Sequence, residues 1–175
     1  EWGNGNWFVS YASAALPFDT EQARLIFAFF TAGMVISRLG FAWFIPLLGS
    51  KNLLRVLVFM MVSGALLVKN IDSATGLALG NLLLGLGLGA VYPLLLSTAM
   101  DLDEHNGPVL SGLSNIAGSL GCQLAGLGTG LWAQQAGIGQ AFWMLPLLAV
   151  WLFASVWWFS RLALPAVRPS NSTTA

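Results

Sequence analysis

Residues 76–100 read GLALGNLLLGLGLGAVYPLLLSTAM and carry no charged side chain. A membrane-spanning helix needs about 20 consecutive, mostly apolar residues, and this stretch is longer. Apolar and polar residues do not alternate in it as they would in a barrel strand, so a transmembrane helix is predicted. Gly85 and Gly89 form a GxxxG pattern, and Pro93, which frees a backbone carbonyl, follows them. The glycines indicate close helix packing, whereas the proline also fits a bending, gating helix beside a cavity.

The composition of the whole chain supports a membrane protein. Its 175 residues are 57% hydrophobic and only 8% charged, whereas a soluble domain carries about 25% charged residues. Seven basic and seven acidic residues give a net charge of zero, so no nucleic-acid partner is predicted. The single cysteine, Cys122, cannot form an internal disulfide. Motifs for serine hydrolysis, metal binding and phosphate binding are absent, so no enzyme activity, cofactor or metal site is predicted.

Apolar stretches separated by short polar connections divide the chain into six predicted helical spans. We interpret five of them as full membrane spans, surrounded by the lipids of the bilayer, and the first as a partial span. The spans are predicted at residues 1–16, 22–48, 53–68, 76–100, 108–134 and 139–163. They form one all-α transmembrane bundle over residues 1–163, because no linker divides them. Residues 164–175 are predicted to form a polar, disordered tail.

Basic residues in the connections predict the orientation of the bundle. Cytoplasmic loops carry an excess of lysine and arginine. One side of the predicted bundle carries four of these residues, and they are Lys51, Arg55, Arg161 and Arg168. The other side carries Arg24 and Lys69. We therefore expect a multi-pass protein of the cytoplasmic (inner or plasma) membrane, with its C-terminus and polar tail in the cytoplasm.

The first predicted helix combines a short length with a polar face. Residues 1–16 would rise ~24 Å as a helix, less than the ~30 Å hydrocarbon core, so we expect a truncated helix. Its face carries Glu1, Asn4, Phe8 and Tyr11 at helical spacing, bordered by Trp7. Such side chains suit a polyol, since amides hydrogen-bond hydroxyl groups and rings stack on sugars. Alternatively, they join neighbouring helices or lie at the membrane interface.

Polar residues in three other spans are further candidates for a cavity. Arg38 lies inside the span 22–48, where an arginine is costly unless it faces protein or water, or extends to the headgroups. An internal ion pair is one interpretation, and Glu1 is a conceivable partner, although nothing in the sequence places the two together. Asn81 and Tyr92 lie along one side of the span 76–100. The span 108–134 carries a polar stripe at four-residue steps, predicted to face protein or water: Ser111, Asn115, Ser119 and Gln123. Within this stripe the predicted cavity-lining residues are Asn115 and Gln123.

Over nearly its whole length the chain resembles the C-terminal half of a major facilitator superfamily transporter. The closest similarity is to the fucose permease-like sugar:proton symporters. Residues 1–11 resemble the E-x-x-x-x-x-W-x-x-x-Y pattern of that group's seventh helix. The eighth helix and the turn after it resemble AGMVISRLG and GSKNLL, and the tenth and eleventh helices resemble GLGLGAVYP and SGLSNIAGSLG.

The resemblance implies a fold, a partner and an activity. The fold would be a six-helix half built from two inverted three-helix repeats, paired with an N-terminal six-helix half that is missing from this chain. The activity would be proton-coupled symport of a neutral sugar or related small polar solute by alternating access. The solute-binding residues that it implies are Glu1, Asn4, Trp7 and Tyr11, with Asn81, Asn115 and Gln123 as further candidates. Two alternatives stay open: an exporter of drugs or amphiphilic compounds with an apolar cavity, and a non-transporting six-helix membrane module.

Overall fold

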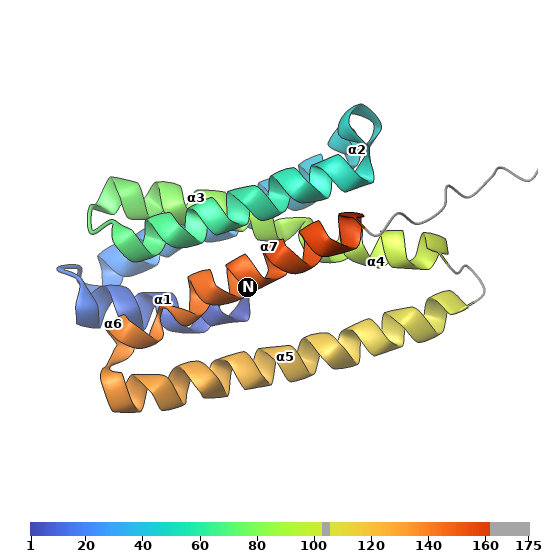
Figure 1. Cartoon of the computed structure of the whole chain (residues 1–175). Helices are drawn as coiled ribbons and strands as arrows, with labels where there is room; N and C mark the ends of the chain where they lie inside the picture. Colours follow the sequence, from blue (N-terminus) through green and yellow to red (C-terminus); the bar gives the residue numbers. More distant parts are fainter. Residues whose placement is uncertain (103–105, 162–175) are drawn as a thin grey trace, which may run out of the picture.

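The computed structural model of the chain describes residues 1–102 and 106–161, and the regular structure in these residues is entirely helical. The elements are α1 (Trp2–Ala15), α2 (Thr20–Asn70), α3 (Ala74–Gly89), α4 (Val91–Leu102), α5 (Gly107–Ala136), α6 (Ile138–Ala141) and α7 (Met144–Arg161). The long helices lie roughly along one common direction (Figure 1). The predicted all-α class is confirmed for these residues. The predicted tail, residues 164–175, lies outside them.

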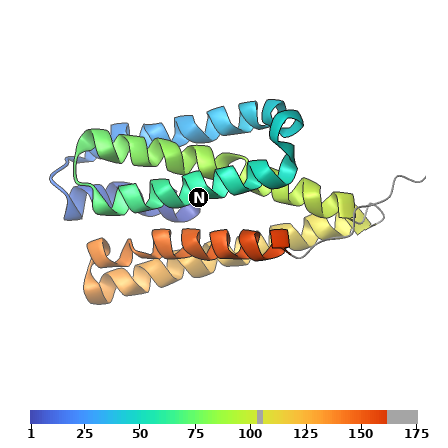
Figure 2. The ribbon, with the colours of Figure 1, turned by 45° about the horizontal axis from the view of Figure 1, so that its top comes forward.

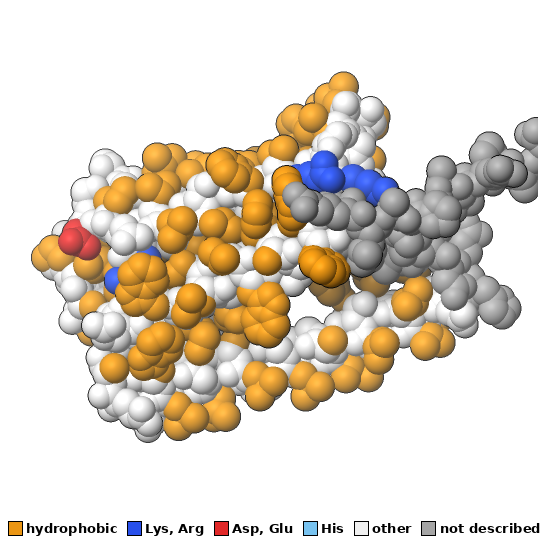
Figure 3. All heavy atoms as spheres, in the orientation of Figure 1, with side chains coloured by type: hydrophobic (Ala, Val, Ile, Leu, Met, Phe, Trp, Pro, Cys, Tyr) orange, Lys and Arg blue, Asp and Glu red, His pale blue; other side chains and the backbone are white. Residues whose placement is uncertain are grey.

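Three helical stretches of the described residues are long and apolar enough to cross a membrane. They are Thr20–Asn70, Ala74–Thr98 and Ile138–Trp158. On the face drawn in Figure 3, acidic side chains are visible at the left end, basic side chains lie near them and at the upper right, and much of the surface between is hydrophobic. These features support association with a membrane. Helix α5 is long enough but is not among the three, because its glycines and polar stripe lower its mean hydropathy.

Helix α2 breaks at Gly49 and folds back on itself (Figures 1 and 2). Gly49 has φ 72° and ψ 151°, a conformation open to glycine because it has no Cβ atom. We call residues 20–48 the first arm and residues 50–70 the second arm. The predicted spans 22–48 and 53–68 fall on the two arms, and the predicted turn GSKN falls on the break. The inverted three-helix repeats stay a prediction.

Helix α3 packs between the two arms (Figure 2). A Cβ atom on Gly85 would overlap the backbone carbonyl of Phe30 in the first arm. On another side of α3, a Cβ atom on Gly87 would lie 2.5 Å from the backbone nitrogen of Met61 in the second arm. Small residues at such contacts let helix backbones approach closely. A Cβ atom on Gly89 would lie 2.7 Å from the backbone carbonyl oxygen of Met34. The interpretation of Gly85 and Gly89 as packing residues is therefore confirmed.

Helices α7 and α5 differ in how firmly they join the bundle. Helix α7 contributes Ala149 and Val156 to the buried cluster that contains Leu57 and Val58 of the second arm. Helix α5 lies on the outside of the bundle (Figure 1), and the buried residues within it are Gly107 and Thr129. Side chains on several sides of α5 therefore face away from the described part of the chain.

Candidate functional site

The break between α3 and α4 lies beside a backbone carbonyl group that has no partner within the helix. Pro93 has no amide hydrogen, so the carbonyl group of Gly89, four residues earlier, loses its helical partner. Helix α3 ends at Gly89 and α4 begins at Val91. Nε of Arg38, from the first arm of α2, donates a hydrogen bond to the Gly89 carbonyl oxygen at 3.2 Å. The proline thus frees an acceptor, and the arginine satisfies it.

The same arginine forms an ion pair with Glu1. Nη2 of Arg38 lies 3.3 Å from Oε1 of Glu1, and the two side chains are 55% and 42% exposed. Gly89 lies roughly 22 Å along the helix axis from Ala74 and roughly 20 Å from Leu102, so the ion pair lies near the middle of the bundle. Charges at this depth are costly against lipid and normally face water or protein.

A second polar pair lies one helical turn beyond Gly89. The hydroxyl group of Tyr92 donates a hydrogen bond to Oδ1 of Asn115 at 2.9 Å, and this bond joins α4 to α5. Both side chains are exposed, and so are Ser119 and Gln123 further along α5. We call this group of exposed residues the polar face: Glu1, Arg38, Tyr92, Asn115, Ser119 and Gln123.

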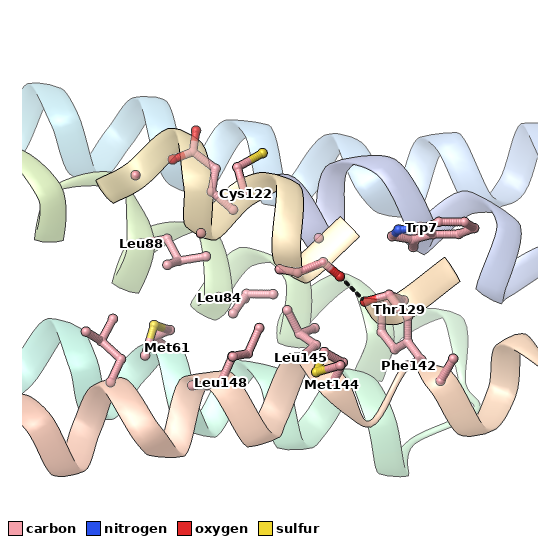
Figure 4. A pocket seen from close by; sticks show the side chains of 18 residues that line it. Trp7, Met61, Leu84, Leu88, Cys122, Thr129, Phe142, Met144, Leu145 and Leu148 are labelled. Carbon is pink, nitrogen blue, oxygen red and sulfur yellow. Dashed lines mark hydrogen bonds between the residues drawn. The ribbon is translucent and has the colours of Figure 1, made fainter. Parts of the chain in front are cut away.

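Beside Glu1 the bundle contains a cavity of about 280 Å³ between α5 and α7 (Figure 4). A gap between α5 and the rest of the bundle is visible in the space-filling view (Figure 3). The labelled side chains of Leu84, Leu88, Leu145 and Leu148 make its walls mostly apolar. The polar lining residues are few, namely Glu1, Cys122 and Thr129. The hydroxyl group of Thr129 donates to the Ala125 carbonyl oxygen at 2.8 Å, so this group is occupied within its own helix.

The eight predicted solute-binding residues fall in several places. Glu1 and Trp7 line the cavity. Tyr92, Asn115 and Gln123 belong to the exposed polar face. Tyr11 is buried, and its ring stacks on Phe142 at 4.1 Å between centroids. Tyr11 lines a different pocket, near the end of the bundle.

Asn4 and Asn81, the remaining two, are fully buried and join α1 to α3. Nδ2 of Asn4 donates to Oδ1 of Asn81 at 3.0 Å, and Nδ2 of Asn81 donates to the Leu77 carbonyl oxygen at 2.9 Å. Neither residue lines the cavity. Their contacts fit the alternative reading, in which amides hold neighbouring helices together. Solute binding by these two residues stays a prediction.

The face of α5 that turns toward the cavity was not predicted from the sequence. Gly118, Cys122, Ala125 and Thr129 lie on this face, next to the polar stripe. Their spacing of three to four residues was visible in the sequence. Small side chains at helical spacing indicate a helix face that leaves space beside it, but they do not show whether another helix or a cavity fills that space.

Comparisons with known proteins do not assign a family. No protein-family model matches the chain, and neither a curated protein nor a solved structure matches it significantly. The resemblance to the major facilitator superfamily therefore stays a prediction. Within the described residues, no group of three or more His, Cys, Asp or Glu side chains is arranged to hold a metal ion.

Proposed function

We propose that this chain is the C-terminal half of a secondary active transporter and that its polar face borders the solute path. The observation that carries the proposal is the ion pair between Arg38 and Glu1, exposed near the middle of an apolar helical bundle. Such a pair is stable in a membrane only beside water or another protein surface. An N-terminal six-helix half in the cytoplasmic membrane would enclose the polar face and leave a water-filled path between the halves.

The break between α3 and α4 provides a position at which this path opens and closes. Irregular backbone at membrane depth occurs where it lines a cavity or is buried in protein. Arg38 attaches the break to the first arm of α2, and Tyr92 attaches α4 to Asn115 of α5. A change in the angle of α4 would break and remake these hydrogen bonds. These two hydrogen bonds would therefore stabilise one of the states between which the transporter alternates.

The polar face favours a neutral sugar or a related small polar solute. Asn115 and Gln123 offer amide donors and acceptors for hydroxyl groups, and the ring of Trp7 lines the adjoining cavity. Glu1 would orient a solute hydroxyl group or take up the proton that drives symport.

The second candidate is export of an amphiphilic compound, which the apolar cavity walls favour. Proton-driven uptake of neutral hexoses, measured beside efflux of a hydrophobic dye, separates the two candidates.

Substitution of Glu1 with glutamine tests the proposal in the intact protein. Glutamine keeps the shape of the side chain but removes its charge, so Arg38 loses its ionic partner. We expect hexose uptake by proteoliposomes to fall about five-fold, since a partly exposed ion pair contributes about 1 kcal/mol, and we expect its pH dependence to change. Glu21→Gln is the matched control, because Glu21 pairs with Arg24 at the end of the bundle. Unchanged uptake with unchanged pH dependence in Glu1→Gln would refute a role for Glu1 in transport.

A further inference from the structure

A second pocket, of about 370 Å³, lies near the end of the bundle where α1 and the second arm of α2 finish and α6 begins. It shares no residue with the cavity beside Glu1. Polar or aromatic side chains supply much of its lining, and they are Tyr11, Lys69, Asp72, Gln140 and Trp143. The transport proposal assigns no role to Lys69, Asp72, Gln140 or Trp143 of this pocket.

Lys69 is held in this pocket by aromatic rings. Its Nζ lies 5.7 Å from the centroid of the Tyr11 ring and 5.1 Å from that of the Trp143 ring. The Tyr11 ring is fixed in turn, because it stacks on Phe142 with an interplanar angle of 2°. Rings attract an ammonium group but do not accept its N–H donors as an oxygen atom does. Among the described residues, Lys69 has neither a hydrogen bond nor an ion pair that would satisfy these donors.

Asp72 brings an opposite charge to the same pocket without neutralising Lys69. No ion pair joins Asp72 to Lys69 or to any other residue in the part of the chain that the structure describes. The pocket therefore presents a separate ammonium group and a separate carboxylate. Its chemical complement is a zwitterion, with an anionic end that accepts from Lys69 and an ammonium end that donates to Asp72.

The position of the pocket in the bundle indicates which kind of zwitterion it binds. It lies near the end of two helices that are apolar enough to cross a membrane, Thr20–Asn70 and Ile138–Trp158. Tryptophan and tyrosine are enriched at this level of membrane proteins, and basic residues there attract lipid headgroups. We infer that the pocket binds a phosphoethanolamine group, with its phosphate on Lys69 and its ammonium on Asp72, as the headgroup of a membrane phospholipid.

Native mass spectrometry of the intact protein in detergent tests this inference. The probes are phosphatidylethanolamine, phosphatidylcholine, whose ammonium has no N–H donor, and phosphatidylglycerol, which has no ammonium. We expect phosphatidylethanolamine to bind about five-fold more tightly than either of the others. Lys69→Gln and Asp72→Asn should each remove this preference, and Lys69→Arg should retain it. Arg24→Gln is the matched control, because it removes a cation at the same end of the bundle but outside the pocket.

Four other results would contradict the binding of a phosphoethanolamine headgroup in this pocket or its identity as a lipid. Equal binding of the three lipids, or an unchanged preference in both Lys69→Gln and Asp72→Asn, would show that the pocket does not select this headgroup. Equal binding of phosphatidylglycerol and phosphatidylethanolamine, abolished by Lys69→Gln alone, would indicate a simple anion site. If soluble glycerophosphoethanolamine binds as tightly as the lipid, the ligand of this pocket is a free solute and not a membrane lipid. Unfolding temperatures of the variants separate these results from misfolding.

Discussion

Replacing Arg38 with leucine in the intact protein is expected to reduce proton-driven hexose uptake by at least about tenfold. The substitution leaves both the Gly89 carbonyl group and the Glu1 carboxylate without the partner that the structure gives them. A hydrogen bond that involves a charged group contributes about 1.5–3 kcal/mol, and about 1.4 kcal/mol corresponds to a factor of ten. The loss should appear in uptake by proteoliposomes that contain equal amounts of folded protein.

Arg38→Lys distinguishes the geometry of the arginine from its charge. A guanidinium group donates from Nε and Nη2 to two acceptors at once, whereas a lysine ammonium is a single point of charge. We therefore expect hexose uptake by Arg38→Lys to lie between the uptake of the wild type and that of Arg38→Leu. Arg24→Gln, at the end of the bundle, should retain wild-type uptake. Wild-type uptake by Arg38→Leu would contradict the assignment of this arginine to the transport machinery.

The largest effect on stability is expected for Gly85→Ala. A methyl group at this position overlaps the backbone carbonyl of Phe30, and a backbone cannot move aside as the end of a flexible side chain can. Overpacked cores lose about 1–3 kcal/mol and occasionally more, and we expect the upper end of this range or beyond. The measurement is the free energy of unfolding in detergent, or the unfolding temperature if unfolding is irreversible.

Gly5→Ala is the matched control for Gly85→Ala. Gly5 lies in α1, and apart from its chain neighbours and the backbone of its own helix no heavy atom lies within 4 Å of the position that its Cβ would occupy. Alanine favours a helix over glycine by about 1 kcal/mol, so this variant should be as stable as the wild type or more stable. If Gly85→Ala and Gly5→Ala change the free energy of unfolding equally, α3 does not approach the first arm as closely as described.

The sequence allowed prediction of features that depend on neighbouring residues along the chain. Long apolar stretches predicted the helices, and the glycines of residues 76–100 predicted the close approach of α3 to its neighbours. The turn GSKN marked the break in α2, where Gly49 adopts a positive φ. In each case local composition limits the backbone geometry, so no knowledge of distant residues was needed.

Features that depend on how the helices are rotated against one another were not predictable. Helical spacing placed Glu1 and Asn4 on one face of α1, but the structure pairs Glu1 with Arg38 and buries Asn4 against Asn81. Those partners are 37 and 77 residues away in the sequence. Periodicity shows which residues share a face of one helix. It does not show which helix lies opposite that face.

If the polar face borders water in the membrane-embedded protein, neighbouring residues of α5 should differ in their access to water-soluble reagents, and cysteine labelling measures this difference. Ser119 and Leu120 are adjacent in α5, lie at the same depth and are both exposed, but they point to different sides of the helix. In a Cys122→Ser background, Ser119→Cys and Leu120→Cys would be treated with a charged, membrane-impermeant maleimide in intact membranes. Because Ser119 belongs to the polar face and Leu120 does not, we expect rapid labelling of Ser119→Cys and almost none of Leu120→Cys. Equal labelling of the two variants, or labelling of Leu120→Cys alone, would contradict the placement of the polar face beside water.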